Sequence, residues 1–201
     1  MATYTNFKRK WWGGPFYNAW IVLVLFLMAY FAGVGSITFV ETNLIFVVSV
    51  IVVLFGYANF VLTGYFKDIF ADKSTGYNTL PVQFGRKTSA VVSDLFGIML
   101  STAVLVLVIS LAFNSFPFQT LITSLVFIYT GIGMSVLTQI SLHSVKTDNE
   151  AHIAISPCVH CYILLLSGLA VLNKPEWFFL LVVFYIFYII TLKIRPAKNQ
   201  I

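Results

Sequence analysis

The sequence predicts an all-α integral membrane protein, a helical bundle of about six transmembrane spans. Three observations predict this class. Hydrophobic residues make up 59% of the 201 residues and charged residues only 9%, whereas a soluble domain carries about 25% charged residues. The mean hydropathy is +0.92. The apolar runs are long and continuous, which indicates helices, because a membrane β-barrel has short segments of alternating hydrophobicity.

Each span needs about 20 largely apolar residues to cross a hydrocarbon core of about 30 Å. The first span follows a basic segment, as a signal peptide does, but its apolar run exceeds the 7–15 residues typical of a signal core. The fifth span is the weakest, because Pro157 and His160 interrupt it. We expect one membrane domain over residues 1–201, with spans at residues 16–37, 43–64, 89–113, 118–142, 153–172 and 177–192.

The basic residues predict the orientation. With six spans, all but one of the 12 Lys and Arg residues fall on the side of the two termini, and the positive-inside rule makes that side cytoplasmic. The net charge of +5 therefore reflects the orientation of the chain in the membrane. We expect the protein to contact membrane lipid and not nucleic acid. We expect a multi-pass protein of a bacterial-type inner membrane. The inner basic residues are Lys8, Arg9, Lys10, Lys67, Lys73, Arg86, Lys87, Lys146, Lys193, Arg195 and Lys198, and the outer one is Lys174.

The longest polar connection, about residues 65–88, lies on the expected cytoplasmic side. Asp68 and Asp72 are four residues apart there, so both carboxylates share one helix face if the second span continues through them. Paired carboxylates favour a cation, and oxygen ligands suit Mg²⁺ shared with substrate phosphates. Lys67 and Lys73 flank the pair. Because the spacing is common, a solvated loop with a helix cap is the alternative.

Polar residues inside the spans extend this region into the membrane. Asn59 and Thr63 precede Lys67 on a common helical face, and Asp94 lies about two turns into the third span. Ionisable residues in spans usually face a bundle interior or a cavity. For Asp94, an interfacial acid paired with a nearby Lys or Arg is the alternative.

Two segments carry a family resemblance. KDIFADKSTGYNTLPVQFG, which begins at Lys67, resembles the second aspartate-rich motif of the UbiA-type membrane prenyltransferase family: D-x-x-x-D, a glycine, then a Thr-Leu-Pro-Val-like segment ending in glycine. The N-terminal Tyr4-x-x-x-Lys8-Arg9 is similar to the family's Tyr-x-x-x-Lys-Arg segment, which precedes its fifth span. The matches occur in order over about residues 4–90.

The resemblance implies a bundle with a central cavity and the transfer of an isoprenyl chain from a polyprenyl diphosphate to a hydrophobic acceptor of aromatic, quinone-precursor, chlorin or lipid type. It implies Mg²⁺ as the cofactor, with Asp68 and Asp72 as catalytic residues and metal ligands. The diphosphate would be bound by Lys8, Arg9, Lys67 and Lys73. The residues expected to line the cavity are Asn18, Asn59, Thr63, Tyr65 and Asp94.

The sequence departs from the family in one respect. Its seven acidic residues form no Asn-Asp-x-x-Asp-x-x-x-Asp first motif, so the chain resembles the C-terminal half, with four spans after the second motif where three are usual. Three explanations stay open: a fragment, a split enzyme completed by a second chain, or a non-catalytic subunit or scaffold. A fragment is simplest, because Asn59 and Thr63 would otherwise face lipid. A small transporter using Asp94 is a weaker alternative, since no internal repeat is evident.

Smaller features have simple interpretations. Cys158 and Cys161 are spaced for a metal or redox site, but packed thiols near the reducing cytoplasm are the simpler expectation. The connection over residues 146–152 is expected to be solvated, with a role in acceptor binding as the alternative. Gly131 and Gly133 are expected at close helix contacts.

Overall fold

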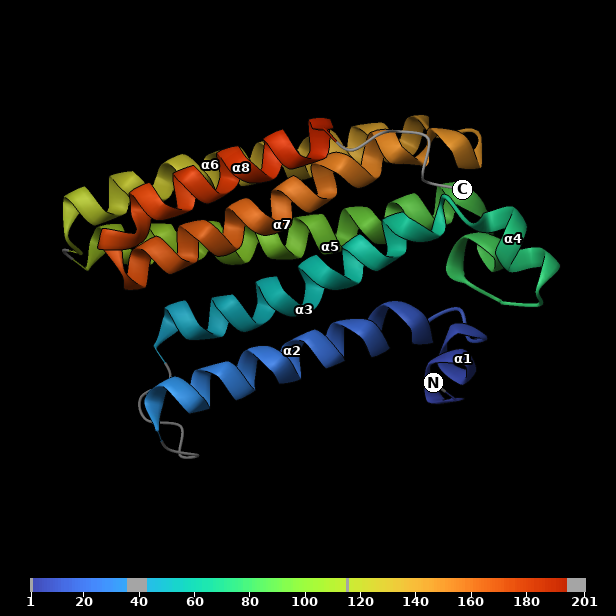
Figure 1. Cartoon of the computed structure of the whole chain (residues 1–201), viewed down its shortest axis with the longest axis horizontal. Coiled ribbons are helices and arrows are strands. Elements are labelled where there is room, and N and C mark those ends of the chain that lie inside the picture. The colour runs from blue at the N-terminus through green and yellow to red at the C-terminus, as the bar shows by residue number, and fades with distance from the viewer. Residues whose placement is uncertain (1, 36–42, 115, 195–201) are drawn as a thin grey trace.

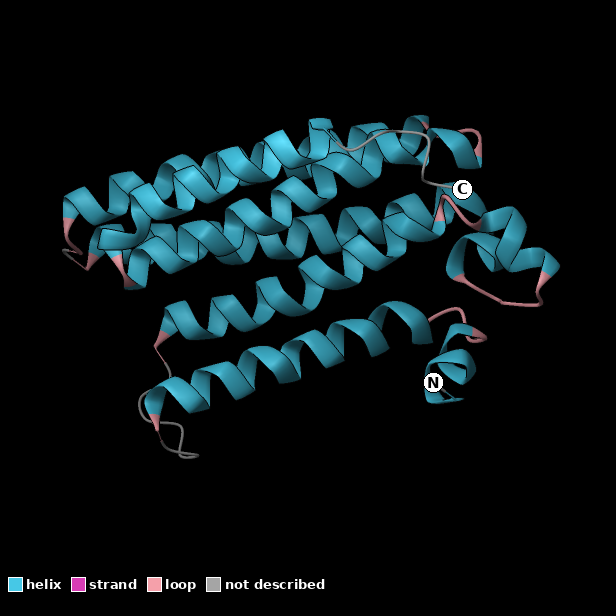
Figure 2. Ribbon diagram, viewed as in Figure 1, coloured by secondary structure: helices cyan, strands magenta, loops and turns pink. Residues whose placement is uncertain are grey.

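In a computed structural model the chain consists of helices joined by loops and turns, with no strand, over the residues that the structure describes, 2–35, 43–114 and 116–194 (Figure 2). Six helices are long and apolar enough to cross a membrane, which confirms the predicted class. Two short helices lie beside them at one end of the bundle (Figure 1). The helices are α1 (Ala2–Lys8), α2 (Gly13–Val34), α3 (Leu44–Tyr65), α4 (Ile69–Ser74), α5 (Leu80–Phe113), α6 (Phe118–Ser144), α7 (His152–Asn173) and α8 (Phe178–Ile194), with 3₁₀ turns η1 (Asp148–Ala151) and η2 (Pro175–Trp177).

The core of the bundle lies between α3, α5, α6 and α7. Each of these helices contributes a fully buried aliphatic side chain to one cluster: Val52, Val104, Ile128 and Leu165. In contrast, α2 buries residues only in its first half, and α8 buries none. The four central helices therefore form a packed unit, and α2 and α8 lie at its periphery (Figure 1).

Small residues allow the closest helix contacts. A Cβ at Gly131 would lie 2.9 Å from a methyl carbon of Leu165, and one at Gly168 would lie 2.6 Å from Ile128 Cγ1. The predicted close contact at Gly131 is confirmed. The same prediction for Gly133 is wrong, because nothing lies within 4 Å of its added Cβ.

The segment predicted as a long connection, residues 65–88, is mostly helical. It contains α4 and the first turns of α5, which begins at Leu80 rather than near residue 89. Gly85 breaks the regular helix with φ 80° and ψ 170°, a conformation that is essentially restricted to glycine. Pro157, which weakened the fifth span in the sequence, lies inside α7 without ending it.

Helix direction places the basic residues mainly at one end. Lys8, Arg9 and Lys10 precede α2, Lys67 follows α3, and Lys193 lies in the last turn of α8. We call this end, which carries α1 and α4, the aspartate end. Lys174, between α7 and α8, lies at the opposite end. Arg195 and Lys198 lie outside the described residues, as do the last two positions of the first predicted span.

Candidate active site

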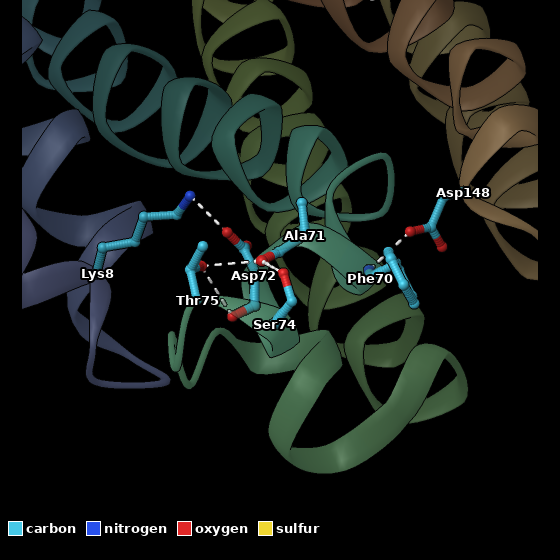
Figure 3. A network of polar contacts seen from close by, with 7 residues as sticks. All are labelled: Lys8, Phe70, Ala71, Asp72, Ser74, Thr75 and Asp148. Atoms are coloured by element: carbon cyan, nitrogen blue, oxygen red, sulfur yellow. Dashed lines mark hydrogen bonds and ion pairs between the residues drawn. The ribbon is translucent and has the colours of Figure 1, made fainter.

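The two resemblance segments meet at the aspartate end. Lys8, the last residue of α1, places its Nζ 2.6 Å from Oδ1 of Asp72 in α4 (Figure 3). The Asp72 side chain is 3% exposed and the Lys8 side chain 17% exposed. An ion pair that is shielded from water interacts more strongly than a surface pair, although burying both charges costs desolvation energy. The contact therefore joins two segments that are far apart in the sequence.

Two tyrosines surround the ammonium group of Lys8. Its Nζ lies 4.7 Å from the ring centroid of Tyr77 and 5.6 Å from that of Tyr65, within the range of cation–π attraction. Tyr65 is buried and approaches α2 so closely that a Cβ on Gly14 would lie 1.8 Å from its hydroxyl oxygen. Gly14 therefore permits the contact between α2 and the ring beside Lys8.

The second carboxylate oxygen of Asp72 differs from the first. Oδ2 is buried and accepts no hydrogen bond from the residues that the structure describes. The Asp72 backbone is held firmly, because its N–H donates to the Asp68 carbonyl at 2.7 Å and its carbonyl accepts from Tyr77 N–H at 2.9 Å. A fixed, buried and unpaired carboxylate oxygen is a group that a cation would satisfy.

Asp68 differs from Asp72 in position and exposure. The sequence suggested that the helix of the second span continues through both aspartates. In the structure it does not, because α3 ends at Tyr65 and α4 begins at Ile69. Asp68 precedes α4, and its side chain is exposed. The break leaves one carboxylate buried against Lys8 and the other in solvent. A helical turn still joins the two residues through their backbone bond.

The other predicted diphosphate ligands lie around this pair without making ion pairs to it. Arg9, Lys67 and Lys73 are exposed, at the end of α1, after α3 and within α4. The site thus has one partly buried cation, Lys8, and several exposed cations in short loops and at helix ends. Exposed cations of this kind add a positive potential around the buried pair.

A contact that the sequence did not reveal fixes the other side of α4. Asp148, in the turn between α6 and α7, accepts a hydrogen bond from Phe70 N–H at 2.8 Å through Oδ2 (Figure 3). Its Oδ1 pairs with Arg86 of α5. The connection at residues 146–152 was expected to be solvated; the Asp148 side chain is 24% exposed, and both of its carboxylate oxygens have protein partners. A carboxylate near the first N–H groups of a helix is favourable, but the sequence gives no indication that this acid comes from a distant turn.

The polar residues of the second span face the bundle and not the lipid. Asn59 and Thr63 are buried, at 4% and 0% exposure. Ser93 Oγ lies 2.6 Å from Asn59 Oδ1 and 2.9 Å from Gln139 Oε1, and this network joins α3, α5 and α6. The sequence argument that these residues would face lipid in a chain of this length is therefore wrong. Asn18 on α2 is half-buried.

Asp94 lies apart from Asn59, on the groove between α5 and α6. Its Oδ2 is 2.8 Å from His143 Nε2, so its partner is a histidine rather than the Lys or Arg considered from the sequence. Cys158 and Cys161 are buried and form no disulfide. Among residues 2–35, 43–114 and 116–194, no group of three or more His, Cys, Asp or Glu side chains is placed to hold a metal ion.

These features define a polytopic helical membrane protein with an ionic site at one end of its bundle. The model of the UbiA prenyltransferase family matches residues 1–155, well over half of the chain, and the protein belongs to that family. No curated protein and no solved structure matches the chain. Members of the family are prenyltransferases that use Mg²⁺ and prenyl diphosphates.

Proposed function

We propose that this chain binds a polyprenyl diphosphate with Mg²⁺ at the aspartate end and contributes to the transfer of its isoprenyl group to a hydrophobic acceptor. The observation that carries the proposal is the Lys8–Asp72 ion pair of 2.6 Å. It joins the two segments that resemble the family's binding motifs. A diphosphate ligand needs cations and a metal ligand at one place, and this contact provides both.

The donor set fits Mg²⁺. The unpaired Oδ2 of Asp72 is a hard oxygen ligand, and Asp68 one turn earlier offers a second carboxylate in solvent. Mg²⁺ dehydrates reluctantly and is commonly held by one or two carboxylates together with substrate phosphates, so we expect binding only in the presence of a diphosphate. When bound, the metal would stabilise the negative charge of the leaving diphosphate.

The chain's own residues would orient and neutralise the substrate. Lys8 is placed to exchange part of its contact with Asp72 for a phosphate oxygen, because its ammonium group has three donors. Arg9, Lys67 and Lys73 surround the mouth as exposed cations. Tyr65 and Tyr77, which already contact Lys8, would present aromatic faces to an allylic cation.

A hollow beside α1 suits the isoprenyl chain. It has a volume of about 380 Å³ and lies between α1, α2 and α3. Aromatic side chains form most of its wall, and they exclude water from an apolar chain and from a reactive cation. The hollow begins at Phe7, the residue before Lys8, so a diphosphate held at Lys8 would have an apolar surface next to it. The lining residues are Phe7, Trp12, Gly13, Phe16, Tyr17, Trp20 and Leu54.

We further propose that the aspartate end faces the cytoplasm, with both termini on that side, as the basic residues indicate. Reporter fusions at residue 1 and after residue 201 measure this directly. Cytoplasmic signals from both support the topology, and an external signal from either contradicts it.

A binding measurement tests the proposed site. The purified chain is titrated with geranylgeranyl diphosphate, with Mg²⁺ or with EDTA, and geranylgeraniol serves as the ligand that lacks phosphates. We expect Mg²⁺-dependent binding of the diphosphate alone. Asp72→Asn should weaken it about 10–100-fold, because losing even an outer-shell partner of a metal has such an effect. Glu176→Gln, at the opposite end, is the matched control. Equal Mg²⁺ affinity with and without diphosphate would reject the bridging role.

Catalysis is expected to need a second set of carboxylates. The 201 residues contain no first aspartate-rich motif, and holding fewer metals removes several kcal/mol of transition-state stabilisation, on the order of a thousandfold or more in rate. We therefore expect weak transfer by the chain alone and restored transfer on co-expression with a chain that carries the first motif. Diphosphate binding without restored transfer would favour a non-catalytic binding subunit, and rapid transfer by the chain alone would contradict this expectation.

A further inference from the structure

A groove runs along the bundle between α5 and α6, separate from the hollow beside α1. Its volume is about 450 Å³, the size of sites that bind small molecules. It begins near Asp94, five residues into the part of α5 predicted to span the membrane, and continues toward Leu105. The groove therefore extends from the aspartate end toward the middle of the bundle.

The groove has a polar start with two buried atoms that lack partners. Asp94 Oδ2 contacts His143, but Asp94 Oδ1 is buried and has no hydrogen-bond partner among the described residues; the same holds for Gln139 Nε2. Gln139 Oε1 lies 2.9 Å from Ser93 Oγ, whose single proton is shared between this oxygen and Asn59 Oδ1 at 2.6 Å. An unpaired polar atom in an apolar environment costs free energy that a suitable ligand would recover.

The rest of the groove is apolar. Beyond Asp94 and Gln139, aliphatic side chains of both helices line it, and the hydroxyl groups of Ser101, Thr102 and Ser135 interrupt them. A ligand that fits must therefore have one polar end and an apolar body. The aliphatic lining consists of Ile98, Leu105, Ile132, Val136 and Ile140.

We propose that this groove binds a membrane-dissolved alcohol or phenol, with its hydroxyl group between Asp94 and Gln139. In this arrangement the hydroxyl would donate to Asp94 Oδ1 and accept from Gln139 Nε2. The Asp94 side chain lines the groove and is 29% exposed, so a small rotation of its carboxyl group would bring the buried Oδ1 to the ligand. A phosphate headgroup is disfavoured, because the carboxylate would repel it. This inference does not rest on the diphosphate site.

Gly97 controls the width of the groove at its polar start. A Cβ at this position would lie 2.8 Å from Gln139 Nε2 and 3.1 Å from Ser135 Oγ. Gly97→Ala therefore moves or blocks the amide that the hydroxyl would contact, while it adds only one methyl group. Gly133→Ala is the matched control, because nothing lies within 4 Å of its added Cβ.

Photolabelling tests the proposal in the purified chain in lipid nanodiscs. The probe is a long-chain alcohol with a diazirine in its alkyl chain, and the comparison probe is its methyl ether, which cannot donate. We expect the alcohol to label residues 94–105 and 132–140 about tenfold more than the ether, the effect of one hydrogen bond to a charged group. Asp94→Asn and Gly97→Ala should each reduce this labelling about tenfold, and Gly133→Ala should not.

Two further measurements keep the test decisive. Unlabelled alcohol should compete with the probe in the unaltered chain, which needs no variant to fold. Geranylgeranyl diphosphate with Mg²⁺ should not compete, and this separates the groove from the proposed diphosphate site. Equal labelling by the alcohol and the ether would overturn the proposal, because the groove would then be only an apolar surface. Cross-links between two chains at the groove, without labelling by the alcohol, would overturn it in favour of a helix contact.

Discussion

The short helix α4 is fixed from two sides, and the two sides are built differently. On one side Asp72 is paired with Lys8 of α1, a buried contact of 2.6 Å. On the other side Asp148 binds Phe70 N–H and pairs with Arg86, and both charged side chains there are about a quarter exposed. Figure 3 shows the two contacts on opposite sides of the helix.

The elements behind the two contacts also differ. Asp148 follows α6 and precedes α7, two helices of the packed core. Lys8 belongs to α1, which is followed by α2, a helix that buries only Gly13, Gly14, Pro15, Ala19 and Leu23. The buried ion pair thus rests on the less packed part of the molecule. We infer that the Lys8 side opens when ligand enters, while the Asp148 side keeps α4 in place.

Asp72→Ala is expected to have the largest effect. It removes the carboxylate that pairs with Lys8, and breaking a buried pair in this way costs about 3–5 kcal/mol. Thermal unfolding in detergent should show a clearly lower midpoint. Asp68→Ala is the matched control, because that side chain is exposed and its loss should change the midpoint little. Equal effects of the two variants would mean that the Lys8 contact contributes nothing to stability.

Lys8→Met should follow, with a loss of about 2–3 kcal/mol, because the methionine keeps part of the apolar packing of Lys8 while the buried Asp72 carboxylate loses its cation. Combining Lys8→Met with Asp72→Ala gives a double-mutant cycle, and we expect a coupling free energy of at least about 1 kcal/mol. Strictly additive losses would show that the two side chains do not interact. The Lys8 side of α4 would then contribute no more to stability than the Asp148 side.

Gly14→Ala tests the aromatic part of the same side. The new Cβ would lie 1.8 Å from the Tyr65 hydroxyl oxygen, and overpacking of this kind costs about 1–3 kcal/mol. Thermal unfolding again measures the effect. Tyr65→Phe in the Gly14→Ala background should recover part of the loss, because it removes the nearest atom and leaves the ring carbon Cζ at 2.9 Å. If Tyr65→Phe did not recover stability, the strain caused by Gly14→Ala would have to come from a contact other than the Tyr65 hydroxyl group.

Asp148→Asn should have the smallest effect, about 0.5–1 kcal/mol, because its ion pair is partly exposed. The asparagine can still accept from Phe70 N–H but no longer attracts Arg86 by charge. Trypsin cleavage after Lys73, an exposed residue of α4, should become about two- to fivefold faster. A destabilisation larger than that of Lys8→Met would reverse the comparison, because the partly exposed contact would then contribute more to stability than the buried one.

The sequence predicted the class of fold well, because long apolar runs leave few alternatives in a membrane. It also brought attention to Lys8 and Asp72, through the spacing of two segments. For the stretch between Tyr65 and Ile69 it left open a continuous helix and a loop with a helix cap. The structure has the break, which separates the environments of Asp68 and Asp72. The contacts of Asp148 and the groove at Asp94 are formed by helices that are far apart in the sequence. Local sequence patterns do not predict such contacts.

The glycine at position 85 divides α5 into two parts. Before it, Phe84 packs its ring edge against Trp11, with centroids 5.3 Å apart, so the first turn of α5 is attached to the linker between α1 and α2. After it, Leu100 and Val104 belong to the core. Amide hydrogen exchange should therefore differ between the two sides of Gly85. The amides of Gln83 and Phe84 should exchange together with α1 whenever that side opens, whereas the amides after about residue 89 should exchange only when the whole bundle unfolds.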